Sequence, residues 1–156
     1  QPYRKLLRHL IGFNASRVEA FNERQKRFLF RLPRMKLYSV VIPVFNEAES
    51  LAKLIDELQA VGSDHQHDSE IILVDDGSTD HSWQVISDLA EKNDLVTGIR
   101  LRRNFGKAAA LSAGFEVAEG EFIFTMDADL QDDPKEIPDF LAKLESPKFD
   151  VVSGWK

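Results

Sequence analysis

Carboxylates crowd the stretch TMDADLQDDP, which ends a short apolar run of the sequence. Five acidic residues lie in or directly beside this stretch: Asp127, Asp129, Asp132, Asp133 and Glu136. Like charges this close repel one another and raise one another's pKa unless a positive charge lies among them. A bound cation would supply that charge, and carboxylate oxygens favour a hard ion such as Mg²⁺ or Mn²⁺.

The spacing within DAD indicates how such an ion would be held. Residues alternate between two sides of an extended chain, so Asp127 and Asp129 point the same way and can reach one ion directly or through water. Gln131 continues the same side and can add a third oxygen. An ion with so few protein ligands completes its coordination shell with phosphate oxygens and water. A solvated acidic turn is the alternative explanation of this motif taken alone.

Short apolar runs alternate with amphipathic stretches from Leu37 onward, and this order predicts the elements that position the carboxylates. The predicted strands cover residues 37–43, 70–76, 96–101, 121–127 and 149–154. The predicted helices cover 47–61 (capped near Asn46 and stopping at Gly62), 80–92, 107–118 and 134–144. Strands that recur with helices between them favour βαβ units, and therefore an α/β fold with a mostly parallel sheet and flanking helices.

Polar residues follow four of the predicted strands. Ligands of open α/β sheets bind at the carboxyl ends of the strands, where the sequence has PVFNE (43–47), DDGS (75–78), RRNFGK (102–107) and DADLQ (127–131). Lys107 lies at the start of a predicted helix, where it can meet a phosphate together with backbone N–H groups. One edge of the sheet therefore collects acids, an amide and a cation.

Other interpretations of these motifs are weaker. The pair Asp75 and Asp76 suggests the magnesium pocket of a response-regulator receiver, but that pocket expects its acidic pair after the first strand, and here a complete strand and helix precede the pair. A dinucleotide-binding domain expects G-x-G-x-x-G after the first strand, and this sequence has PVFNE there. His65 and His67 lie in a polar loop without evident partner ligands, so we expect them to be solvated.

Four segments together resemble a known family. VVIPVFNEAESL, ILVDDGSTD, RNFGKAAALSAGF and MDADLQDDP are similar to the motifs of inverting family 2 glycosyltransferases. The resemblance covers residues 37–156 and implies the GT-A fold, the Rossmann-like fold of nucleotide-diphospho-sugar transferases. RNFGK and DADLQDDP look most like the branch that moves sugars from nucleotide sugars to polyprenyl phosphates.

The resemblance implies roles for individual residues. Pro43, Phe45 and Glu47 would line the nucleotide pocket, and Asp76 would bind the base. Asp127, Asp129 and Gln131 would hold Mg²⁺ or Mn²⁺ on the diphosphate, which makes Asp127 and Asp129 the expected catalytic residues. The expected contacts to the nucleotide sugar are Pro43, Phe45, Glu47, Asp75, Asp76, Lys107 and Asp127. Asp132 and Asp133 are expected to start the helix before Pro134.

The reaction implied is attack on the anomeric carbon of the donor sugar with inversion. A lipid phosphate acceptor is already anionic and needs no general base, whereas a hydroxyl acceptor needs one. Two alternatives stay open: a family 2 enzyme acting on a polysaccharide or a soluble hydroxyl acceptor, and a non-enzymatic nucleotide-binding or receiver-like module. We expect the chain to be the nucleotide-sugar-binding part of a longer protein, truncated at its C-terminal end.

Charge divides the sequence into a basic arm and an acidic body. Residues 1–36 carry ten Lys and Arg against two Glu, a formal charge of +8, and residues 37–156 carry ten Lys and Arg against 24 acids, or −14. The arm has the pattern of an amphipathic helix, which suits an anionic membrane surface or packing against protein equally well. The acidic body argues against nucleic acid as a partner. Cysteine is absent, and no apolar run is long enough to span a bilayer. We expect peripheral attachment to the cytoplasmic face of a membrane, and a homo-oligomer is compatible with the sequence.

Overall fold

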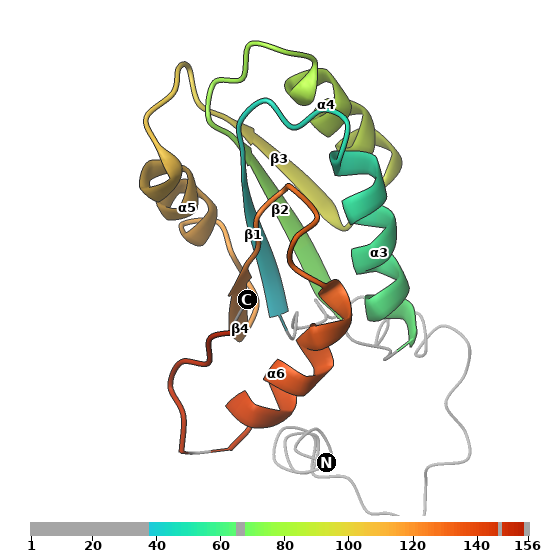
Figure 1. The fold of residues 1–156 in the computed structure, drawn as a ribbon, viewed down its shortest axis with the longest axis vertical. Helices are drawn as coiled ribbons and strands as arrows, with labels where there is room; N and C mark the ends of the chain where they lie inside the picture. The colour runs from blue at the N-terminus through green and yellow to red at the C-terminus, as the bar shows by residue number, and fades with distance from the viewer. Residues whose placement is uncertain (1–37, 65–67, 147, 155–156) are drawn as a thin grey trace, which may run out of the picture. The chain divides into compact units, whose positions relative to one another are not determined.

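The computed structural model describes residues 38–64, 68–146 and 148–154, which form a β-sheet with helices on both faces (Figure 1). Its elements in chain order are β1 (Tyr38–Val44), α3 (Leu51–Asp64), β2 (Ser69–Asp75), α4 (Ser82–Lys92), β3 (Val96–Arg100), α5 (Lys107–Phe115), β4 (Phe122–Thr125), the 3₁₀ helix η2 (Pro134–Glu136) and α6 (Ile137–Leu144). Strands and helices alternate as far as β4, which confirms the α/β class predicted from the sequence.

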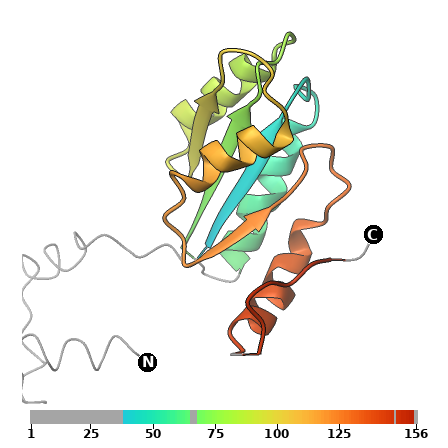
Figure 2. The same ribbon diagram turned by 90° about the vertical axis from the view of Figure 1, so that its left-hand side faces the viewer.

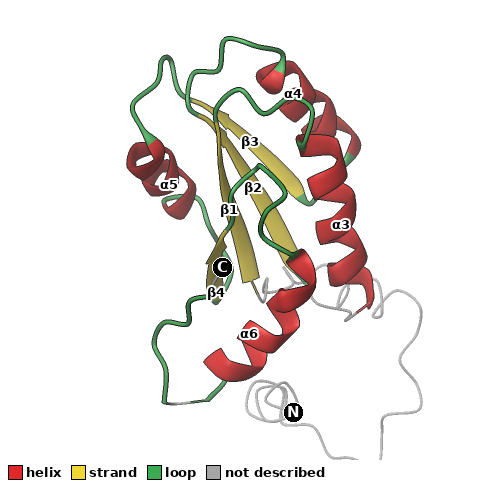
Figure 3. Cartoon of the chain, viewed as in Figure 1, coloured by secondary structure: helices red, strands yellow, loops and turns green. Residues whose placement is uncertain are grey.

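The four strands pair in parallel in the order β3-β2-β1-β4. Their carboxyl ends consequently face the same edge of the sheet. The loops that follow β1, β2 and β3 gather at that end, and the loop after β4 rises towards it (Figure 3). This arrangement brings together loops that are up to about eighty residues apart in sequence.

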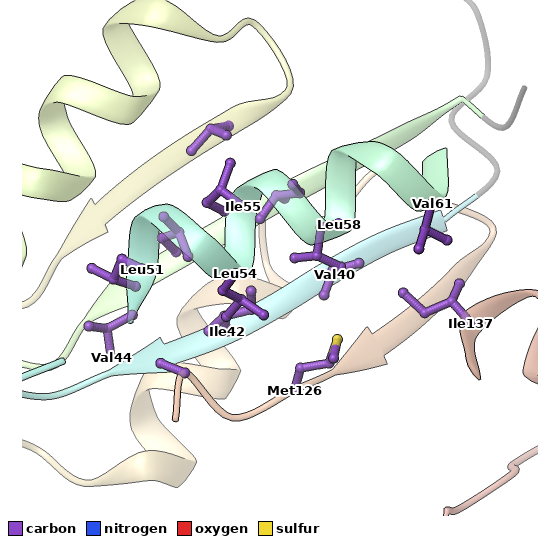
Figure 4. Close-up of a cluster of buried hydrophobic side chains, with 14 of the residues drawn as sticks. Val40, Ile42, Val44, Leu51, Leu54, Ile55, Leu58, Val61, Met126 and Ile137 are labelled. Atoms are coloured by element: carbon purple, nitrogen blue, oxygen red, sulfur yellow. The ribbon is translucent and has the colours of Figure 1, made fainter. Parts of the chain in front are cut away.

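Two apolar layers hold the sheet between its helices. Val40, Ile42 and Val44 on one face of β1 pack against α3 with the buried side chains of Met126 and Ile137 (Figure 4). Alternate positions face the other way: Val41 joins a second cluster with Ile72, Val74 and Ala110 of α5. Figure 2 shows α5 across the sheet face opposite to α3 and α4. Helices cover both faces of the sheet, which explains why the strand sequences are continuously apolar.

Several details of the predicted elements are wrong, among them the end of the predicted helix 107–118, since α5 ends at Phe115. Residues 149–154 form no strand in the structure, because this apolar run pairs with no described strand, and Val151 is 81% exposed. Asn46 does not cap α3, since the first helical bond runs from Leu54 N–H to Ser50 O. The helix also continues past Gly62 to Asp64, because glycine weakens a helix without having to end it.

Some predictions fall on residues that the structure does not describe. The basic arm at residues 1–36, with its proposed membrane role, lies outside the described residues, as do His65 and His67. The division into an arm and a body at residue 36 also stays a prediction. Among the helices that are described, none is both long and apolar enough to cross a bilayer.

Candidate functional site

A pocket of about 370 Å³ opens at the carboxyl edge of the sheet. Residues from all four strand ends line it: Pro43, Val44, Phe45, Glu47, Asp76, Asn104, Gly106, Lys107, Asp127, Ala128 and Asp129. Seven of the predicted site residues are therefore brought together here, namely Pro43, Phe45, Glu47, Asp76, Lys107, Asp127 and Asp129. The other two, Asp75 and Gln131, are not part of the lining.

The loop after β1 is fixed by side chains of the loop after β2 and of the first residue of α4. The N–H groups of Asn46 and Glu47 donate to Ser78 Oγ and Ser82 Oγ at 3.0 and 2.9 Å. In return, Asn46 Oδ1 accepts from Thr79 N–H at 2.9 Å. Asn46 has a φ of 58°, in the left-handed region that asparagine tolerates better than most residues. These contacts hold the loop that presents Phe45 and Glu47 to the pocket.

Asp76 fixes the loop after β3. Its two carboxylate oxygens accept the backbone N–H groups of Phe105 and Gly106 at 2.7 and 2.8 Å. Gly77 allows this loop to approach, because a Cβ on Gly77 would lie 2.4 Å from the carbonyl carbon of Arg103. Asp76 thus sets where α5 begins, and the first residue of α5 is Lys107.

Asp75, the neighbour of Asp76, is buried beneath the site. Its Oδ1 accepts Ser78 N–H at 2.9 Å, which closes the turn after β2. Its Oδ2 accepts no hydrogen bond among the described residues and lies 3.3 Å from Arg100 Nε as an ion pair. The Arg100 guanidinium also stacks over the Trp83 ring, 5.5 Å from its centroid. The surroundings of Asp75 therefore give it a structural role.

The DAD segment runs into a turn at Ala128 and Asp129, so the extended geometry predicted between Asp127 and Asp129 is wrong. Leu130 has a φ of 64°, which reverses the chain so that Gln131 N–H donates to Asp129 Oδ1 at 3.0 Å. Packing of the Leu130 side chain against the main core favours this otherwise costly backbone conformation. The turn keeps Asp129 on the pocket and removes Gln131 from its lining.

The two acids after the DAD segment have different roles. Asp133 caps η2, its side chain accepting Lys135 N–H at 3.0 Å, as predicted for a helix-start residue. Asp132 differs from the prediction, because its Oδ2 accepts the N–H of Asp127 at 3.0 Å. Asp132 therefore fixes the backbone of the DAD turn from the other side.

Charge in the pocket is strongly negative. Four carboxylates line it, from Glu47, Asp76, Asp127 and Asp129, against the single ammonium of Lys107. Lys107 Nζ donates to Asp127 Oδ1, so the lysine pairs with the first acid of DAD. In the described part of the chain, no three His, Cys, Asp or Glu side chains are arranged as a metal-binding group. The pair Asp127 and Asp129 fits a Mg²⁺ or Mn²⁺ ion that takes its remaining ligands from phosphate and water.

Asn104 lines the pocket but was not among the predicted site residues. It lies in the strand-end segment RRNFGK, so its position pointed to the site, but an amide beside two arginines gave no reason to single it out. Gly106 also lines the pocket, with a φ of 95° that favours glycine at the start of α5.

Comparison with known proteins agrees with this geometry. The family model described as "Glycosyl transferase family 2" matches residues 39–156. The chain is 42% identical over 119 residues to dodecaprenyl-phosphate galacturonate synthase of Rhizobium johnstonii, covering 76% of this chain and 35% of the relative. It is 46% identical over 115 residues to undecaprenyl-phosphate 4-deoxy-4-formamido-L-arabinose transferase of Pseudomonas fluorescens, covering 73% and 34%. The chain thus spans about a third of the length of these curated relatives.

Solved structures share the fold. The mannosyltransferase PcManGT from Pyrobaculum calidifontis, in complex with GDP-Man and Mn²⁺, superposes with a TM-score of 0.64 at 26% identity, over 80% of this chain and 39% of that one. TarS of S. aureus in complex with UDP gives a TM-score of 0.56 at 25% identity, over 71% and 32%. These similarities confirm the predicted GT-A fold and exclude the receiver interpretation. The chain belongs to glycosyl transferase family 2.

Proposed function

We propose that this chain is the donor-binding part of an inverting glycosyltransferase that moves a sugar from a nucleotide sugar to a polyprenyl phosphate at a membrane surface. The observation that carries the proposal is the pocket itself. It combines the carboxylates of Asp127 and Asp129 with Lys107 and with the loops after β1 and β2. Its donor would be a UDP-sugar or a GDP-sugar.

The negative charge of the pocket supports a donor site that depends on a metal ion. A nucleoside diphosphate is an anion, and four carboxylates against one lysine would repel it. Asp127 and Asp129 would hold Mg²⁺ or Mn²⁺. When bound, such an ion would supply positive charge to offset the negative charge of the leaving nucleoside diphosphate. Gln131 stays a predicted ligand, and the turn at Leu130 argues against it.

Other residues of the pocket would bind and orient the donor. Lys107 and the first N–H groups of α5 would contact phosphate oxygens, as helix starts commonly do. Phe45 is 44% exposed at the pocket and offers a surface for the nucleotide. Both carboxylate oxygens of Asp76 already accept backbone N–H groups, so Asp76 could contact the base only through their remaining lone pairs. We therefore assign Asp76 mainly to positioning the loop after β3.

The acceptor is proposed from the relatives. The names of the two curated relatives described above contain dodecaprenyl phosphate and undecaprenyl phosphate. A phosphate oxygen of such a lipid is already a charged nucleophile, so the anomeric carbon can be attacked without a general base from this chain. An enzyme acting on a polysaccharide or a soluble hydroxyl acceptor would need that base.

The donor site is tested by calorimetric titration with UDP and with GDP, each with and without Mn²⁺. We expect one nucleotide to bind in a metal-dependent way and Asp129→Ala to abolish that binding. Asp139→Ala, which removes an exposed carboxylate of α6, is the matched control and should bind as the unchanged protein does. Metal-independent binding that survives Asp129→Ala would contradict the proposed site.

The acceptor is tested by transfer of labelled sugar in the full-length protein. Label should enter the organic phase when undecaprenyl phosphate is supplied. Transfer to a soluble sugar or polysaccharide, with none to the lipid, would favour the alternative acceptor class.

The basic arm is predicted to attach the protein to anionic membranes. Ten cationic residues in residues 1–36 would gain electrostatic attraction to acidic lipids, and reversing several charges would oppose it. We expect sedimentation with phosphatidylserine vesicles to fall when Arg4, Lys5 and Arg8 are all changed to Glu. Unchanged sedimentation of that variant would contradict a membrane role for the arm.

A further inference from the structure

Lys107 and Asp127 form an ion pair inside the pocket. The lysine is the first residue of α5 and Asp127 follows β4, so the pair joins two loops of the carboxyl edge. The Lys107 side chain is 60% exposed and that of Asp127 is 37% exposed. The pair is therefore accessible to solvent and to any ligand that enters the pocket.

The two ends of the lysine are held very differently. Its backbone is fixed, because Asp76 accepts the N–H groups of the two preceding residues. Gly106 O also accepts the N–H groups of Ala109 and Ala110 at 3.0 and 3.2 Å, which closes the first turn of α5. The ammonium lies on a flexible four-carbon stem. It can exchange one anionic partner for another without movement of the backbone.

Asp127 has two competing uses. As one of two DAD carboxylates, it would be a ligand of a divalent cation on the donor. In the structure its Oδ1 accepts from Lys107. An ammonium on this carboxylate and a divalent cation beside it repel each other, so both cannot be held there at full strength. A nucleoside diphosphate in the pocket would offer Lys107 a different anionic partner.

We propose that Lys107 is an exchangeable counter-ion of Asp127, which leaves the carboxylate for the diphosphate when the nucleotide binds and thereby couples cation binding to nucleotide binding. This inference rests on the proposed donor site. It assigns Lys107 a role on both ligands: it weakens binding of the cation alone and strengthens binding of the nucleotide. Because such coupling is reciprocal, each ligand should raise the affinity for the other.

The test measures Mn²⁺ binding by electron paramagnetic resonance on the whole chain, without and with a saturating concentration of the nucleotide identified by calorimetry. Lys107→Met keeps most of the side-chain volume and removes the charge. It should raise the affinity for Mn²⁺ alone by about three- to tenfold, the range for losing a half-exposed ion pair and its repulsion of the ion. The factor by which nucleotide increases Mn²⁺ affinity should shrink, by up to the same amount.

Lys92→Met is the matched control, since Lys92 is an exposed lysine in the last turn of α4. It should leave both Mn²⁺ affinities unchanged. If Lys107→Met bound Mn²⁺ alone no more tightly than the unchanged protein does, the exchange of Lys107 between Asp127 and the diphosphate would be overturned. The proposed function would still stand if the unchanged protein bound a nucleotide in a metal-dependent way. If the unchanged protein bound neither UDP nor GDP with Mn²⁺, both proposals would fail.

Discussion

The two edges of the sheet use the same residue types for different purposes. At the amino-terminal edge, Glu70 Oε1 accepts both Ser39 Oγ and Glu119 N–H at 2.7 Å. Ser39 Oγ in turn accepts Gly120 N–H at 2.9 Å. This network ties β1 and β2 to the segment that leads into β4, and it closes that edge. At the carboxyl edge, four carboxylates instead line a pocket of about 370 Å³.

The difference shows that a carboxylate at a strand end is not by itself a functional residue. Glu70 and Asp75 are buried and hold backbone segments together, while Asp127 and Asp129 line open space. Asp76 belongs to both groups, because it lines the pocket and also holds a loop through two N–H groups. What separates a structural acid from a functional one is the space that it faces.

The largest expected effect is that of Asp76→Ala. It tests whether a carboxylate that lines the pocket at the carboxyl edge, the open edge of the sheet, also has a structural role. The change leaves the N–H groups of Phe105 and Gly106 without their acceptor, at a cost of about 2–4 kcal/mol in the free energy of unfolding. Nucleotide affinity should also fall, because the start of α5 loses its anchor. Urea unfolding and calorimetry measure the two effects. A loss of affinity with unchanged stability would show that Asp76 acts on the ligand alone.

Gly120→Ala tests the amino-terminal edge of the sheet, where the Glu70 network closes the edge. It should lower the free energy of unfolding without a direct effect on the pocket. A Cβ on Gly120 would lie 2.4 Å from Ser39 N, so β1 or the segment before β4 must shift. We expect a loss of about 1–3 kcal/mol in urea unfolding. Gly62→Ala adds the same methyl group within α3, 3.3 Å from Ser69 Oγ, and should change stability by less. Nucleotide affinity that fell for Gly120→Ala while the protein remained folded would contradict the separation of the two edges.

The sequence predicted the contents of the open edge well, for a simple geometric reason. Parallel strands place their carboxyl ends at one edge, so listing the residues after each apolar run also listed most of the pocket. The end of α4 at Lys92 and the start of α5 at Lys107 agree with the predicted helices, whereas α4 starts at Ser82, two residues later than predicted.

Features that depend on tertiary contacts escaped prediction. Which of the neighbouring acids Asp75 and Asp76 faces the pocket is decided by the ion pair with Arg100 and by the approach of the loop after β3. The left-handed turn at Leu130 depends on core packing that sequence spacing does not reveal. The apolar run 149–154 had strand composition, but a strand also requires a neighbour to pair with.

The smallest expected effect concerns pH and the exposed contacts that join the loops of the open edge. Asp80 accepts the N–H groups of Ser82 and Ala48 at 2.9 and 3.3 Å. The Ser82 side chain, followed by these N–H groups, holds the pKa of Asp80 below its ordinary value of 3.8. Because the folded pKa is lowered, the stabilisation is present above pH 3.8 and is lost as the pH falls through the folded pKa.

Asp80→Ala should therefore lower Tm by about 2–4 °C at pH 6, since an exposed carboxylate contributes less than about 1 kcal/mol. The difference in Tm between this variant and the unchanged protein should become smaller in thermal melts below pH 3.8. Asp94→Ala removes an exposed carboxylate from the turn before β3 and serves as the control, with a smaller effect. If the difference in Tm between Asp80→Ala and the unchanged protein stayed constant down to pH 2.5, the charge of the Asp80 carboxylate would not be what joins the loop after β1 to the loop after β2. The loop after β1 would then be joined to the residues after β2 by the neutral contacts of Asn46, Ser78 and Ser82.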